Sequence, residues 1–145
     1  MCCVDTLATC APTPVEALID HGSPAVLISS HIAEILCLTP QPLFKSLSFS
    51  GTFDKEESLK LDPLVLTHYC RLHVQSPDTI WKSCALNAVI CLNLHTDIIL
   101  GLDFLVKNKI VIDVDLCTII AKESGYDLLN LPNAKSNQKL PVRSL

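Results

Sequence analysis

Apolar and polar positions in the first third of the chain follow two different periods. Residues 15–19 and 25–28 are short apolar runs typical of buried strands, and they flank a polar turn at residues 20–23. Within residues 31–39 the apolar positions then recur at helical spacing, and prolines follow. This part of the chain therefore predicts a strand, a tight turn, a second strand and a short helix.

The middle of the chain alternates with the period of two that strands show. Residues 43–49 form one strand candidate, and residues 64–75 place apolar side chains on one face and polar side chains on the other. A Ser-Pro-Asp-Thr turn at 76–79 separates this run from residues 80–94. We expect residues 64–94 to form a long antiparallel hairpin.

The last patterned stretch combines strands with one more helix. Residues 97–100 are the kind of apolar run that is buried on both faces. Residues 102–107 suit a short helix, and residues 110–114 and 117–121 suit two strands. Taken along the whole chain, the pattern predicts an all-β fold with one or two short helices.

Length and composition predict one folded domain. The chain has 145 residues, of which 49% are hydrophobic and 18% charged, so it can build a core without metal or disulfide support. Beyond residue 129 the composition becomes basic and rich in polar residues. We expect an N-terminal segment at 1–13, the domain at 14–128, and a linker or disordered tail at 129–145.

Charge and hydropathy argue against two classes of partner. The net charge of −4 does not supply the basic surface that nucleic acids require. The longest apolar stretch, at 85–94, is too short to span a bilayer, which takes about 20 residues. The first fifteen residues lack the basic start of a secretion signal. We therefore expect no nucleic-acid partner, no membrane contact and a cytoplasmic location.

The eight cysteines favour burial over metal binding or disulfides. No C-x-x-C pair occurs, and five of the cysteines lie within apolar patterns where a thiol behaves as a small hydrophobe: Cys37, Cys70, Cys84, Cys91 and Cys117. A metal-binding β domain using His68, Cys70 and His73 is the weakest of three functional interpretations, because strand alternation separates His73 from the other two. We expect no metal and no cofactor.

Two motifs carry the candidate chemistry. An apolar run at 17–19 leads into Asp20-His21-Gly22-Ser23, and about eighty residues later an apolar run contains Ile99-Leu100-Gly101 and is followed by the predicted helix. Their order and spacing resemble the retropepsin-like aspartic proteases, especially those of gypsy-like long-terminal-repeat retrotransposons. The resemblance extends over residues 15–120, and its active-site motif is a variant of the family's Asp-Thr/Ser-Gly.

The resemblance implies a closed acid-protease barrel with its active site at a homodimer interface. Asp20 would be the catalytic residue, with His21, Gly22 and Ser23 in the active-site loop and Ile99, Leu100 and Gly101 supporting that loop from behind. A flap would close over a peptide substrate, and the residues assigned to it are Gly51, Thr52, Phe53 and Asp54. The substrate would be a retroelement polyprotein, processed in the cytoplasm, including within retroelement particles.

The chemistry itself explains why one motif per chain needs two chains. Peptide hydrolysis by paired carboxylates requires one protonated and one ionised acid beside a water. Since the chain has a single Asp-x-Gly, the second carboxylate comes from a second copy across a two-fold axis. Gly22 would let the backbone approach and donate to the Asp20 carboxylate, and Gly101 would let residues 98–100 pass close behind the loop.

His21 and Ser23 distinguish this motif. In the family a hydroxyl occupies the place of His21 and bonds across the dimer. We interpret His21 as a structural histidine with a satisfied ring, in preference to a catalytic base. The Ser23 hydroxyl is expected to donate to the outer oxygen of Asp20. His21 also motivates the alternative function, a catalytically degenerate fold kept as a dimerising or peptide-binding module.

Overall fold

The computed structural model of the chain describes residues 2–5, 13–49 and 64–129. Within these ranges strands predominate, with eleven strands and two helices of six residues each. The prediction of an all-β fold with short helices is confirmed. Neither of the two helices in the described ranges is long and apolar enough to cross a membrane.

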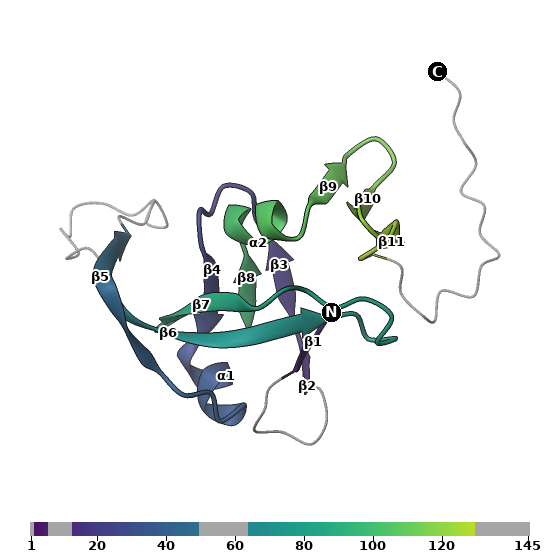
Figure 1. The fold of residues 1–145 in the computed structure, drawn as a ribbon. Coiled ribbons are helices and arrows are strands. Elements are labelled where there is room, and N and C mark those ends of the chain that lie inside the picture. The colour runs from purple at the N-terminus through teal and green to yellow at the C-terminus, as the bar shows by residue number, and fades with distance from the viewer. Residues whose placement is uncertain (1, 6–12, 50–63, 130–145) are drawn as a thin grey trace.

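The larger sheet contains eight strands (Figure 1). In spatial order they are β2 (Thr13–Val15), β1 (Cys2–Asp5), β6 (Leu64–Gln75), β7 (Leu86–Cys91), β4 (Val26–Ser29), β8 (Ile98–Leu100) and β3 (Ala17–Ile19), while β5 (Gln41–Phe49) pairs with β6. Most neighbouring strands are antiparallel, but β3 with β8 and β4 with β7 are parallel.

A closed barrel is not formed by the described strands, so that part of the prediction is wrong for them. The two ends of the sheet, β2 and β3, share no hydrogen-bonded ladder and are joined through Glu16 alone. At Glu16 the backbone changes partners: its N–H donates to Asp97 Oδ2 at 2.8 Å and its carbonyl accepts from the N–H of Ile98 at 3.2 Å. The predicted single strand at 15–19 is therefore two short strands on different partners.

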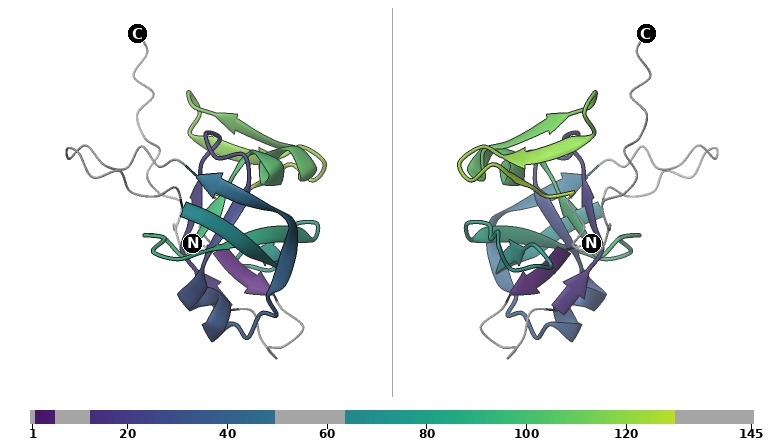
Figure 2. Two further views of the ribbon diagram at one scale, coloured as in Figure 1. Left: turned by 90° about the vertical axis from the view of Figure 1, so that its left-hand side faces the viewer. Right: turned by 90° about the vertical axis from the view of Figure 1, so that its right-hand side faces the viewer.

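The smaller sheet forms a separate layer at one end of the larger one (Figure 2). It follows the second helix, α2 (Leu102–Lys107), and its order is β11 (Tyr126–Asp127), β10 (Thr118–Ala121) and β9 (Ile110–Asp113). The sequence pattern predicts α2 and closely matches β9 and β10. It misses β1 and also β11, which has only two residues.

Two other predicted elements are longer than the observed ones. The first helix, α1 (Ser30–Ile35), ends ahead of Pro40, because Cys37 adopts a left-handed conformation with φ of 53°. Of the predicted strand at 80–94 only β7 is regular. Ahead of it, Ser76 Oγ accepts a hydrogen bond from the Trp81 N–H and Ser83 Oγ accepts one from the Val74 N–H, so side chains replace ladder partners there.

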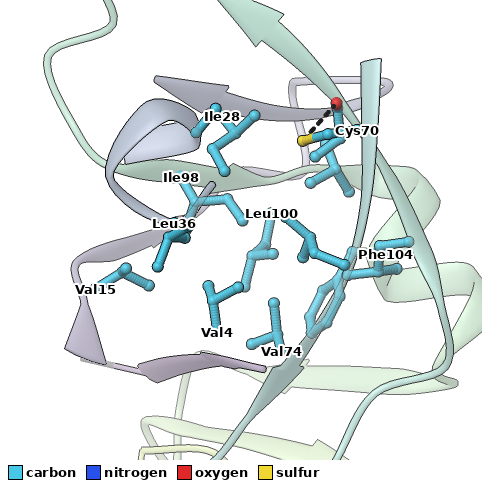
Figure 3. Close-up of a cluster of buried hydrophobic side chains, with 14 of the residues drawn as sticks. Val4, Val15, Ile28, Leu36, Cys70, Val74, Ile98, Leu100 and Phe104 are labelled. Atoms are coloured by element: carbon cyan, nitrogen blue, oxygen red, sulfur yellow. Dashed lines mark hydrogen bonds between the residues drawn. The ribbon is translucent and has the colours of Figure 1, made fainter. Parts of the chain in front are cut away.

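The core lies between β1, β4, β6, β8 and the two helices (Figure 3). Among its fully buried side chains are Val4, Ile28, Leu36, Ile98 and Phe104, and the Phe104 ring meets Trp81 edge-on at 6.1 Å. Cys70 is buried with them, and its thiol donates to the carbonyl of Ala88. Burial raises the pKa of Cys70 to about 11, so this thiol stays protonated at neutral pH.

The cysteine prediction is confirmed only for the central strands. Cys70 and Cys91 are buried, but Cys37, Cys84 and Cys117 are exposed. The exposed three lie in turns or just outside strands, where an apolar neighbourhood in sequence does not mean burial in space. Cys37, Cys70, Cys84, Cys91 and Cys117 are free thiols.

A polar turn connects the two sheets. Asp78 accepts hydrogen bonds from the Ser76 hydroxyl at 2.5 Å, from the Ile80 N–H at 3.0 Å and from the Tyr126 hydroxyl at 2.7 Å. Since Tyr126 belongs to β11, this bond ties the small sheet to the turn between β6 and β7. The three donors, that of Ser76 foremost, hold the pKa of Asp78 below its ordinary value.

The lowered pKa of Asp78 predicts that the protein loses stability as the pH falls. A depressed carboxyl pKa in the folded state stabilises the protein above the unfolded pKa, and the contribution disappears as the pH falls through the folded pKa. Urea unfolding between pH 5 and pH 2.5 should show a falling midpoint, and the fall should be smaller in Asp78→Asn. Asp115→Asn is the control because Asp115 is exposed, and an equal reduction in that variant would contradict the assignment.

Candidate active site

The Asp20 loop leaves the end of β3 and returns to β4, and β8 lies between these two strands. β3 pairs with β8 in parallel, with Ile19 opposite Leu100, while β4 pairs with β8 in antiparallel, with Leu27 opposite Ile99. The N–H of Asp20 continues the ladder by donating to the carbonyl of Leu100 at 3.1 Å. Both ends of the loop are thus held by the same short strand.

Gly101 lies directly behind the loop, as the sequence predicts. A Cβ added there would be 2.2 Å from the carbonyl oxygen of Ala25 and 2.4 Å from that of Ser23. The close approach lets the first N–H groups of α2 donate to loop carbonyls, from Leu102 to Ser23 at 2.7 Å and from Asp103 to Pro24 at 3.2 Å. The loop therefore caps α2, which has no side-chain cap.

The Asp20 carboxylate is half-buried and makes one hydrogen bond within the described chain. Its Oδ1 accepts the N–H of Gly22 at 2.9 Å, as the sequence predicts. A Cβ on Gly22 would sit 3.1 Å from that same oxygen, which is tighter than ordinary contact. No described residue bonds Oδ2, so one carboxylate oxygen is available to an outside partner.

The Ser23 hydroxyl does not donate a hydrogen bond to the Asp20 carboxylate, so the prediction of that bond is wrong. Its hydroxyl donates to the carbonyl of Ala25 at 3.0 Å, and a hydroxyl has only one proton to donate. Its N–H instead donates to the Asp20 carbonyl at 3.1 Å, which closes the turn. Ser23 shapes the loop and leaves the acid free.

His21 is exposed, and its ring makes no hydrogen bond within the described ranges. Within the described residues no partner satisfies the ring, so the interpretation of a structural histidine stays a prediction. His21 instead lines the rim of an open groove of about 590 Å³. The other groove residues come mainly from α2 and β9, and include Leu102, Val106, Val111, Lys109 and Lys122.

The flap prediction, Gly51 to Asp54, lies outside the described residues. What the structure does place is the pair of strands on either side of that segment, β5 and β6, which run antiparallel with Phe49 opposite Leu64. Two further acids near the loop have structural partners. Asp97 accepts the N–H of Glu16, and Asp103 pairs with Lys107 at 3.1 Å.

The candidate metal ligands His68, Cys70 and His73 do not come together in one cluster. In the described part of the chain no three His, Cys, Asp or Glu side chains gather in a way that could hold a metal ion. His68 Nδ1 bonds the Thr67 hydroxyl at 2.8 Å, while His73 Nδ1 lies 3.1 Å from the Ser83 carbonyl.

Sequence reasoning missed the apolar groove beside His21. Its members come mainly from α2 and β9, and the apolar patterns of these segments in the sequence indicate only a helix and a strand, so no signal in the sequence places them beside His21. In comparisons with known proteins, no family model and no curated protein matches this chain. The local geometry of the Asp20 loop is what supports a function.

Proposed function

We propose that this chain is an aspartic endopeptidase of the retropepsin type that acts as a homodimer through Asp20. The observation that carries the proposal is the Asp20 carboxylate itself. It stands on a loop held by β8 and α2, with one oxygen fixed by the Gly22 N–H and the other without a described partner. A reacting group positioned in this way on a rigid support is what catalysis requires.

The mechanism follows from bringing two such carboxylates together. Two adjacent acids cannot both ionise, so the pair holds one proton between them. The ionised member takes a proton from a water, which adds to the scissile carbonyl, while the protonated member gives its proton to the carbonyl oxygen. The C–N bond of the tetrahedral intermediate then breaks as its nitrogen takes the proton that the first acid removed from the water, while the other carboxylate takes a proton from a hydroxyl of the intermediate, which leaves as the new carboxyl group.

A peptide substrate would bind in extended form. Such binding uses main-chain hydrogen bonds, with pockets for alternate side chains. Gly51, Thr52, Phe53 and Asp54 would supply the flap, and a retroelement polyprotein in the cytoplasm would be the natural substrate. No cofactor takes part in this chemistry.

The alternative is a degenerate protease fold that dimerises or binds peptides without cleaving them. His21 favours it, because an exposed imidazole without a described partner stands where the family has a hydroxyl that bonds across the dimer. The experiment that separates the two functions is incubation of the purified chain with a peptide library at pH 4 to 7, followed by mass spectrometry. Cleavage that disappears in Asp20→Asn supports the protease, whereas peptide binding without cleavage supports the alternative.

His21→Thr is expected to raise kcat/KM for a cleaved peptide by about tenfold. A threonine hydroxyl can both donate and accept across a two-fold axis, which would hold the two loops in one geometry. The measurement is steady-state kinetics of both proteins at equal dimer concentration. His21→Val, which is β-branched without a hydroxyl, is the matched control, and an equal gain in that variant would contradict a role for the hydroxyl.

A further inference from the structure

A small cavity lies against the strands that hold the Asp20 loop, between β3, β8, the end of β6 and α2. Its volume is about 70 Å³. Its wall includes Ile19, which directly precedes Asp20, and Leu100, whose carbonyl accepts the Asp20 N–H. Asp20 is not among the residues that line it, and no residue lines both this cavity and the groove beside His21. In the described part of the chain the cavity is therefore a site of its own.

The wall of the cavity is apolar and uncharged. Three of its residues, Val74, Leu100 and Phe104, are drawn in Figure 3. The rings of Phe104 and Trp81, both more than nine-tenths buried, meet edge-on at 6.1 Å and form another part of it. Among the described residues that line the cavity there is no acid, lysine, arginine or histidine. Because an unpaired charge is strongly disfavoured in such surroundings, a ligand of this cavity is uncharged.

One residue of the wall offers an unused polar group. Gln75, the last residue of β6, is only 7% exposed, and its side-chain amide makes no hydrogen bond with the described residues. The neighbouring Ser76 hydroxyl is already used, because it donates to Asp78 and accepts the N–H of Trp81. A buried amide can both donate and accept, and one such group in an otherwise apolar wall is what orients a bound ligand.

We infer that this cavity binds a small, uncharged aliphatic carboxamide, whose amide bonds to the side chain of Gln75. The volume sets the size of the ligand: a water requires at least about 10–15 Å³, so 70 Å³ holds about five waters or a molecule of about four to six non-hydrogen atoms. A carboxamide matches a glutamine side chain because each group both donates and accepts. The aliphatic part contacts Ile19 and Leu100, on the paired strands that hold the Asp20 loop.

The full chain carries its own reporter for this site. Trp81 is the single tryptophan of the sequence and lines the cavity. Isobutyramide is the probe, and it should change the Trp81 fluorescence saturably, with a dissociation constant in the millimolar range, because so small a ligand buries little surface. Isobutyrate has the same skeleton with a carboxylate, and it should bind at least about tenfold more weakly. The absence of a saturable change with isobutyramide, or equal binding of isobutyrate, overturns the inference.

Gln75→Met tests the polar contact. Methionine keeps the length of the side chain and removes its amide, so the dissociation constant for isobutyramide should rise about tenfold. Gln41→Met is the matched control, because Gln41 lies on β5, outside the cavity, and it should leave the dissociation constant unchanged. Equal dissociation constants in these two variants contradict the role of Gln75.

Ala17→Ile tests the location by filling the cavity. Side chains alternate along a strand, so Ala17 and Ile19 lie on the same face of β3, and both line the cavity. The larger side chain should raise the dissociation constant for isobutyramide at least about tenfold, with circular dichroism establishing that the variant is folded. Ala17→Val, which adds less volume, takes its place if the isoleucine variant does not fold. A folded variant with the affinity of the wild type overturns the location.

The site and the proposed function fail separately. A chain that binds isobutyramide through Gln75, but cleaves no peptide, retains the site and loses the proposed function. A chain that cleaves peptides through Asp20, but shows no saturable response of Trp81, retains the function and loses the site.

Discussion

Asp20→Asn is expected to lower kcat/KM for peptide cleavage by a factor of at least about 10³, while leaving the fold intact. General acid and base steps each contribute about 10² to 10⁴ in rate, and both depend on the same pair of acids. Asparagine keeps a carbonyl oxygen that can accept the Gly22 N–H, so the bond that shapes the loop survives. Asp20→Asn therefore removes the group that transfers the proton but keeps the geometry of the loop.

The measurements for this prediction are kinetics and urea unfolding of the same preparations. The free energy of unfolding should change by less than about 1 kcal/mol, which is typical of a substitution that keeps its hydrogen bond. Glu34→Gln is the control, because it removes an exposed carboxylate from α1. Cleavage that survives in Asp20→Asn would refute the assignment of Asp20 and with it the proposed mechanism.

Gly101→Ala is expected to destabilise the protein by more than about 3 kcal/mol or to prevent folding. The added methyl carbon would be 2.2 Å and 2.4 Å from two carbonyl oxygens of the loop, both of them backbone atoms. Backbone cannot yield as a flexible side chain does, so β8 or the loop must move in a closely packed interior. Movement would also break the bonds from α2 to the loop, such as that from Leu102 to Ser23.

Gly125→Ala separates this steric effect from the general cost of replacing glycine. Gly125 has φ of +72° with nothing within 4 Å of an added Cβ, so its substitution costs only the strain of a left-handed backbone, about 1 kcal/mol. Urea unfolding of both variants gives the comparison. Similar losses at Gly101 and Gly125 would show that β8 does not pass as closely behind the loop as described.

The two strongest predictions concern different parts of one arrangement. Gly101 lets β8 and α2 approach the loop, and the loop in turn presents Asp20. The open groove that His21 lines also includes residues of the same helix. Substitutions that displace α2 are therefore expected to lower the rate of cleavage, since the helix bonds directly to the loop that carries Asp20.

The sequence predicts most of the regular elements because their signals are local. Alternation over 64–75 predicts β6, including the burial of Leu66, Cys70 and Leu72, and helical spacing predicts α2. The sequence-based prediction is wrong where burial or strand pairing depends on segments that are far away in the sequence. His68, on the predicted apolar face, is exposed, while Gln75, on the predicted polar face, is buried.

What the sequence by itself determines is the order of the elements, the candidate acid Asp20 and the need for glycine at two positions. These follow from residue type and short-range spacing. Only the tertiary structure decides that the Ser23 hydroxyl turns to Ala25, that His21 has no described partner, and that β9 keeps an open edge. The reason is physical: a hydrogen bond or a free edge depends on which distant segment arrives beside it, and β8 reaches the Asp20 loop from about eighty residues away.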